Sequence, residues 1–179
     1  RHTVDDLGSA IELCYANGWT DGLPVIPPTA ERIEAMLEAG GLKPDQQLSF
    51  IENRQVSVTA EKVAINAVMA GCKPEYMPVL LAAIEAALEP LFTLHGVLAT
   101  TYFSSPVIIV NGPVVKRIGM NSGINALGQG NRANASIGRA LNLIVRNVGG
   151  GRPGAECGNG RHADASLLVF SGAAVTSSG

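Results

Sequence analysis

Residues Asn121 to Gly154 read NSGINALGQGNRANASIGRALNLIVRNVGGGRPG and combine a glycine-rich loop with a long helix. The loop spans Gly123 to Gly130, and the helix is expected to begin near Asn131 and to end at the glycine run that starts at Gly149. Free N–H groups at a helix start, together with the helix dipole, favour an anion. The segment therefore predicts a loop-helix site for a carboxylate or phosphate group.

Three arginines of this helix are spaced for one face. Arg132, Arg139 and Arg146 lie seven positions apart, close to two helical turns, so their guanidinium groups are expected to project from the same side. We expect Arg132 and Arg139 to hold the anion. Backbone amides of the loop and the helix start are expected to bind the same anion, and they belong to Gly128, Gly130, Asn131 and Asn134. The structural alternative is that the glycines permit a tight turn and close packing, while the arginines pair with acids on neighbouring chains.

The run from Gly128 to Ala133 also matches G-x-G-x-x-A, the dinucleotide fingerprint. That fingerprint follows a strand directly within a βαβ unit. Here about fifteen residues separate the loop from the expected strand that ends at Val110. The spacing argues against a Rossmann site and favours a smaller anion.

Charged residues make up only 16% of the 179 residues, whereas hydrophobic residues make up 46%. Ordinary soluble domains carry about a quarter charged residues. So little charge predicts that a partner covers part of the surface, as in a homo-oligomer or a complex subunit. The net charge of −2 gives no reason to expect nucleic acid or an anionic membrane as a partner.

The chain is expected to be cytoplasmic. Its longest apolar runs are interrupted by Asn66, Lys73 and Glu85, so no membrane span is expected. No basic segment followed by an apolar stretch opens the sequence, so no signal peptide is expected. An odd number of cysteines without a framework spacing favours reduced thiols. These cysteines are Cys14, Cys72 and Cys157.

The remaining sequence predicts one domain of the α/β or α+β class over residues 1–179. It is expected to have a small mixed sheet, an N-terminal helical subdomain at 1–46 and a C-terminal tail at 172–179. Helices are predicted at 4–17, 30–39, 60–70, 75–88, 114–118 and 131–148. Strands are predicted at 48–51, 55–58, 97–100, 107–110 and 166–170. The helices at 60–70 and 75–88 are apolar nearly all round and predict a buried helical hairpin or an oligomer interface.

Three further polar residues are candidates for the site. Asp21 lies in a loop made rigid by prolines, where it could bind a cation or a substrate hydroxyl, or stabilise a turn. Asn111 follows the strand that ends at Val110, and could orient a ligand carbonyl or close an Asx turn. His95 precedes an expected strand, and could serve as a general acid or base or be a structural histidine.

No metal site is expected. Cys157 and His162 form a C-x₄-H pair beside Glu156, but no second pair with metal-ligand spacing accompanies them. Cys14 and Cys72 are expected to be core cysteines, because neither lies at a helix start that would lower the pKa of its thiol. The sequence identifies no cofactor.

Three blocks of the sequence carry a resemblance to known proteins: GWTDGLPVIPPT at Gly18 to Thr29, VTAEKVAINAVMAGCKPEYMPVLLAAIEA at Val58 to Ala86, and LGQGNRANASIGRALNLIVRNVGG at Leu127 to Gly150. They resemble a family of poorly characterised bacterial proteins associated with UGSC-type (seleno)proteins. The family positions found here are Asp21, Asn111, Gly128, Gly130, Asn131, Arg132, Asn134 and Arg139. The resemblance implies a cytoplasmic enzyme or enzyme subunit, with thiol or selenol redox chemistry nearby, and it ends at Pro153 and Gly154.

Together these features predict an enzyme, or the substrate-binding subunit of one, that acts on a small carboxylate- or phosphate-bearing metabolite. The loop-helix segment would hold the anion, Asn111 would orient the substrate, and His95 would transfer a proton, with Asp21 as a second catalytic candidate. Proton transfer, a lyase reaction and redox-associated chemistry all stay open. The alternatives are a non-catalytic assembly subunit and a thiol redox protein that uses Cys157.

Overall fold

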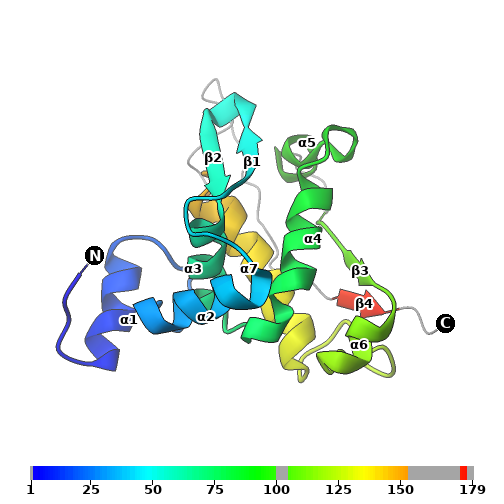
Figure 1. Cartoon of the computed structure of the whole chain (residues 1–179), viewed down its shortest axis with the longest axis horizontal. Coiled ribbons are helices and arrows are strands. Elements are labelled where there is room, and N and C mark those ends of the chain that lie inside the picture. The colour runs from blue at the N-terminus through cyan, green and yellow to red at the C-terminus, as the bar shows by residue number, and fades with distance from the viewer. Residues whose placement is uncertain (1, 100–104, 153–173, 177–179) are drawn as a thin grey trace.

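The computed structural model describes residues 2–99, 105–152 and 174–176, which form a mixed α/β fold (Figure 1). The helices are α1 (Leu7–Ala16), α2 (Ala30–Gly40), α3 (Ala60–Ala70), α4 (Met77–Ala87), α5 (Leu94–Ala99), α6 (Pro113–Arg117) and α7 (Arg132–Asn147). The strands are β1 (Gln47–Ile51), β2 (Val56–Thr59), β3 (Ile108–Val110) and β4 (Ala174–Thr176). Short 3₁₀ turns lie at Glu52–Arg54, Pro74–Tyr76 and Pro90–Phe92.

Local signals set most helix ends. Thr29 and Thr59 occupy the N-cap positions of α2 and α3, as predicted, but neither side chain makes a capping hydrogen bond. Gly71 ends α3 in the left-handed region at φ 90°, which a residue with a side chain rarely adopts. The expected start of the first helix at Val4 was wrong. The helix begins later because the carboxylate of Asp6 accepts a hydrogen bond from the Ser9 amide at 2.9 Å and caps it there.

The core is built around α3 and α7. α3 packs chiefly against α7 and α2, and α4 packs against α2 and α7 (Figure 1). The predicted hairpin of the third and fourth helices therefore exists as two buried helices joined through α2 and α7, rather than as a self-contained pair. Small residues on α3, such as Ala64 and Ala67, are fully buried and allow α7 to approach closely.

The strands form two separate two-stranded sheets instead of one mixed sheet. β1 pairs with β2 antiparallel, and β3 pairs with β4 parallel. The expected buried strand at 107–110 exists as β3, but its middle residue Ile109 is 63% exposed. Residues 174–176, expected to be part of a tail, pair with β3 as β4. The predicted strand at 166–170 lies outside the described residues.

The strand predicted at 97–100 was wrong, because residues 94–99 form α5. Leu94, Val97 and Leu98 are spaced three and four positions apart, which suits one face of a helix as well as a short apolar strand. The helix begins when the Val97 amide donates to the carbonyl of Thr93 at 3.1 Å. His95 therefore lies on an exposed helix.

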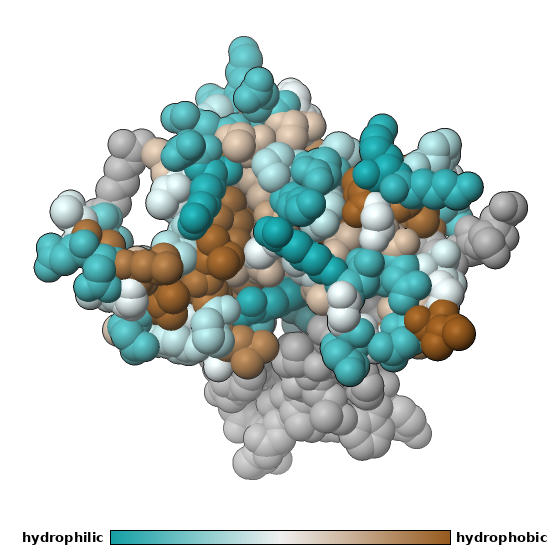
Figure 2. Space-filling view, turned by 90° about the horizontal axis from the view of Figure 1, so that it is seen from below, coloured by the Kyte–Doolittle hydropathy of each residue, from teal (hydrophilic) through white to brown (hydrophobic). Residues whose placement is uncertain are grey.

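Several large apolar side chains are exposed. In the view from below, hydrophobic side chains form separate areas among hydrophilic ones (Figure 2). The exposed apolar residues include Leu23, Leu91, Val107, Ile109, Ile124 and Leu127. No single helix in the described part of the chain is long and apolar enough to cross a membrane. One pair, Pro74–Ala87 with Pro90–Leu98, has the required length and composition together, with a bend of 68°.

Candidate functional site

The asparagines at the start of α7 hold the glycine-rich loop instead of facing an open site. The Asn131 side chain accepts a hydrogen bond from the Asn134 amide at 3.0 Å and donates to the Gly119 carbonyl at 2.8 Å. Asn134 is only 2% exposed. Its side chain accepts from the Asn121 amide at 3.0 Å and donates to the carbonyls of Asn121 and Ala126. The polar groups of both side chains are thus engaged by the protein itself.

The glycines of the loop have local explanations. A Cβ atom at Gly128 would overlap the side-chain amide of Asn125, so a larger residue would have to displace that side chain. Gly130 adopts φ 117°, in the region that favours glycine. These two positions fit the structural alternative, in which the glycines serve a tight turn.

The arginines of α7 bind separate protein groups. Arg132 donates through Nε to the Gly71 carbonyl at 2.9 Å and so satisfies the end of α3. Arg139 makes a bidentate ion pair with Asp21, with Nε and one terminal nitrogen each 2.8 Å from a carboxylate oxygen. Its terminal nitrogen also reaches the carbonyls of Leu23 and Pro24 at 3.3 and 2.9 Å. In this structure the charge of Arg139 is already neutralised by Asp21 of the same chain.

The Asp21 carboxyl group has a structural role as the ion-pair partner of Arg139. Burial raises its pKa, but hydrogen bonds and the charge of Arg139 outweigh burial and hold the pKa below the ordinary value of 3.8. Asp21 also accepts a hydrogen bond from the Leu23 amide at 3.3 Å, which closes the turn. The assignment of Asp21 as a catalytic group is not supported by this geometry, since a paired carboxylate is a poor base.

Residues 18–29, here called the N-terminal strap, lie across α7 and α3. Asn147 near the end of α7 donates to the Trp19 carbonyl at 2.8 Å and also to the side chain of Asn66. The Ile26 amide donates to the Met69 carbonyl at 3.2 Å. Asn147 Oδ1 and Arg146 Nε are buried and find no hydrogen-bond partner among the described residues. The hydrogen bonds made by Trp19 and Ile26 hold the strap against the two central helices.

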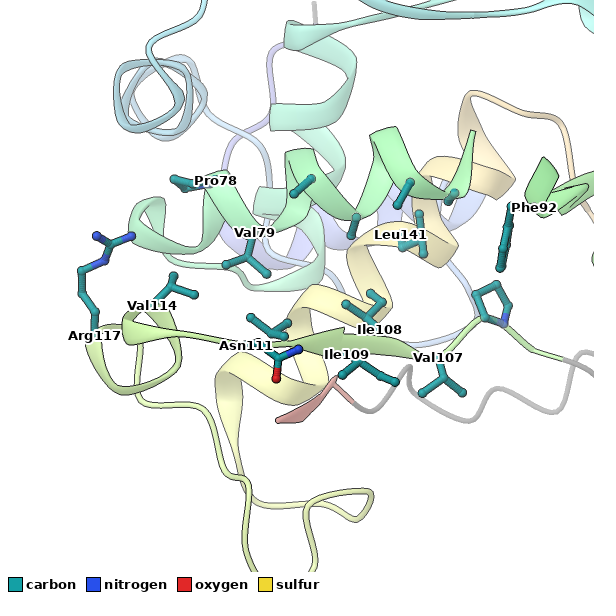
Figure 3. A pocket seen from close by; sticks show the side chains of 16 residues that line it. Pro78, Val79, Phe92, Val107, Ile108, Ile109, Asn111, Val114, Arg117 and Leu141 are labelled. Atoms are coloured by element: carbon teal, nitrogen blue, oxygen red, sulfur yellow. The ribbon is translucent and has the colours of Figure 1, made fainter. Parts of the chain in front are cut away.

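A groove of about 630 Å³ lies between α4 and β3 on the described surface (Figure 3). One wall consists of alanines and Val79 from α4, and the other consists of β3 and the residue before it. Its lining is almost wholly apolar, and its one charged residue is Arg117. Figure 3 places Arg117 beside Pro78 at one end of the groove and Phe92 at the other.

Of the residues proposed from the sequence, only Asn111 lines this groove. His95 is exposed on α5 and is not part of the lining, so the structure does not bring it together with Asn111. Sequence reasoning missed Arg117, whose side chain forms no hydrogen bond or ion pair with the described residues. The sequence feature that could have identified it is its position on the short helix that follows Asn111, near the end of a strand.

The described cysteines are buried free thiols, as predicted for Cys14 and Cys72. Burial raises the pKa of Cys72 to about 11, against smaller opposing effects of Ser136 and Arg132. Among the described residues, no cluster of His, Cys, Asp or Glu side chains could hold a metal ion. Cys157 and His162 lie outside the described residues.

Comparison with known proteins finds no matching protein-family profile, no similar curated protein and no similar solved structure.

Proposed function

We propose that this chain binds a small anionic molecule with an apolar body, as an enzyme or the substrate-binding subunit of one. The observation that carries the proposal is the apolar groove between α4 and β3 with Arg117 at one end. Pockets for small ligands are typically apolar, with a few polar groups that fix the ligand's orientation. Arg117 suits a carboxylate or phosphate because a guanidinium group can donate two parallel hydrogen bonds to either.

The groove dimensions narrow the ligand class. Its α4 wall runs from Pro78 to Ala87, which corresponds to roughly 13 Å at 1.5 Å per residue. An unbranched or small-ring apolar body of that length would lie along Ala82, Ala83 and Ala86, with its anionic group at Arg117. Because the described part of the lining contains no acid, histidine or thiol, any proton or electron transfer would use groups outside that part. That composition favours a substrate-binding role over a catalytic one for the groove itself.

The test is calorimetric titration with straight-chain carboxylates of increasing length. Full burial of a methylene group contributes about 0.8 kcal/mol. An open groove should realise part of this, so each added methylene should lower the dissociation constant by roughly two- to fourfold. The trend should stop once the chain outgrows the groove. Affinity that does not change with chain length would refute the proposal.

Variants make the test specific to the groove. Arg117→Met should remove the preference for a carboxylate over the alcohol of the same length. Lys116→Met is the matched control, because Lys116 is an exposed neighbour on α6 that does not line the groove. Ala82→Phe should block the groove and weaken long carboxylates more than short ones, since Ala82 is exposed and its replacement does not disturb the core.

A second candidate function is that of a non-catalytic assembly subunit. It is favoured by the exposed apolar residues, among which Leu91 is 96% exposed. Light scattering of the purified protein separates the two candidates in part. A monomer at all concentrations would count against the assembly subunit and leave the ligand groove standing.

A further inference from the structure

Three Asn-Gly pairs occur in the sequence, at Asn17, Asn111 and Asn159, and the last lies outside the described residues. An Asn-Gly pair can modify itself, because glycine has no Cβ to hinder attack of its amide nitrogen on the preceding side chain. In a folded protein the attack also requires that the glycine amide is accessible to base and is not held in a hydrogen bond. The structure distinguishes the two described pairs on this point.

The first pair is held by the end of α1. Asn17 is the C-cap residue of this helix, and the Gly18 amide donates to the Tyr15 carbonyl at 2.9 Å. The side-chain amide of Asn17 donates to the Leu13 carbonyl at 2.8 Å. Attack at Asn17 would break both hydrogen bonds, so the fold protects this pair although Asn17 is exposed.

The second pair lies between β3 and α6 and lacks that protection. Asn111 and Gly112 are both exposed. The Gly112 amide donates to no described residue, whereas the Gly112 carbonyl accepts from the Val115 amide at 3.1 Å. Gly112 adopts φ 93°, in the region that favours glycine. The turn into α6 therefore favours the residue type that leaves its nitrogen unhindered.

We propose that Asn111 is a site of spontaneous modification, where the Gly112 amide converts it to aspartate and isoaspartate. A base removes the proton of the Gly112 amide, and the nitrogen attacks the side-chain carbonyl carbon of Asn111. The new C–N bond closes a cyclic imide while the bond to the side-chain nitrogen breaks, and that nitrogen takes up a proton and leaves as ammonia. Water then opens the imide at either carbonyl carbon, which yields aspartate or isoaspartate.

The modification alters the groove between α4 and β3. β3 forms one wall of this groove, and α6 carries Arg117 at one end. Isoaspartate adds a methylene group to the main chain between these two elements, which shifts Arg117 relative to β3. Both products add a negative charge to the same segment, which disfavours an anion at Arg117. This consequence rests on the proposed function, whereas the modification itself does not.

The experiment incubates the native protein and the urea-denatured protein at mildly alkaline pH and follows each Asn-Gly pair by peptide mass mapping. Mass mapping detects the conversion of an amide to an acid, and fragmentation of the peptide distinguishes isoaspartate from aspartate. The measured quantity is the rate at Asn111 divided by the rate at Asn17. We expect this ratio to be at least about fivefold larger in the native protein than in urea, because folding holds Asn17 and Gly18 by two hydrogen bonds.

Asn111→Gln is the matched control, because glutamine keeps the side-chain amide but must close a larger ring that forms more slowly. This variant should show no conversion at position 111 during the same incubation. Titration with octanoate gives the second readout. The affinity of the wild type should fall at least about twofold as the converted fraction approaches completion, whereas the affinity of Asn111→Gln should not change during incubation.

The outcomes separate this inference from the proposed function. A rate ratio that is the same in the native protein and in urea, or native conversion at Asn17 without conversion at Asn111, overturns the modification site. Conversion at Asn111 with unchanged octanoate affinity supports the modification site and overturns its effect on the groove. Conversion at Asn111 in a protein that binds no carboxylate even when fresh supports the modification site and overturns the proposed function.

Discussion

Replacing Arg139 by Met should destabilise the fold without affecting the groove. The variant removes both hydrogen bonds to Asp21 and leaves that carboxylate without its countercharge, in a place where the two side chains are only 18% and 11% exposed. Breaking a buried ion pair costs about 3–5 kcal/mol, and an exposed pair is worth about 0.2–1 kcal/mol. For this largely buried pair we expect about 2–3 kcal/mol. At 2–4 °C per kcal/mol, the melting temperature should fall by roughly 4–12 °C.

The assay is chemical and thermal denaturation of Arg139→Met, Asp21→Asn and the double variant. The double-mutant cycle should give a coupling energy of at least about 1.5 kcal/mol, because the two side chains act as one unit. Arg132→Met is the matched control on the same helix, and loss of its hydrogen bond to a carbonyl should cost about 1 kcal/mol or less. A coupling energy near zero would refute the structural role of the pair.

The pH dependence of the stability difference between the wild type and Arg139→Met is a second check. Arg139 holds the pKa of Asp21 below 3.8 in the folded state. The ion pair therefore contributes its full stabilisation at pH values above the pKa that Asp21 has in the unfolded chain. Its contribution is lost as pH falls through the lower folded pKa. The stability gap between the wild type and Arg139→Met should therefore be constant from about pH 8 to pH 5 and shrink below about pH 4. A gap that shrinks near neutral pH would point to a different titrating group.

Asn134→Ala should destabilise the protein by about 2–4 kcal/mol in urea denaturation, because it leaves the backbone groups of Asn121 without partners inside the protein. Asn131→Ala should cost only about 1 kcal/mol, the usual value for a lost N-cap, and equal effects would contradict the buried role of Asn134. With its pKa raised to about 11, Cys72 should resist a thiol-reactive reagent at pH 8 in the native protein. It should react fully in denaturant, and rapid native labelling would show that the thiol is not buried.

Most of the local structure followed from capping residues and hydrophobic spacing. Helix α3 was predicted with both ends correct, because the N-cap residue and the C-terminal glycine are adjacent to it in the sequence. Gly71 ends the helix in the left-handed region, whereas Thr59 occupies the N-cap position without a side-chain hydrogen bond. Residues 94–99 were misassigned because a short apolar run satisfies the spacing of a strand and of a helix alike, and packing then decides. The pairing of β4 with β3 depends on a distant partner, which no local pattern reveals.

The site was harder to predict for the same reason. Spacing placed Arg139 on a defined face of α7, but whether its guanidinium is free depends on Asp21, which reaches it from far along the chain. The backbone amides of Asn131 and Asn134 were expected to bind an anion, but the Asn134 amide donates to the Asn131 side chain. The side chains of both residues bind the backbone of the preceding loop. Arg117 gained its importance only when folding brought α4 beside β3.

The contact between Asp21 and Arg139 also has a bearing on biosynthesis, since 118 positions separate the two residues. At about 5–20 residues per second, a ribosome needs roughly 6–24 s to progress from the first residue to the second. During that interval the strap lacks its countercharge on α7, and Val25, which is buried in the finished protein, has only part of its cover. Nascent chains halted before Arg139 should therefore be more sensitive to protease in the strap than chains released at full length.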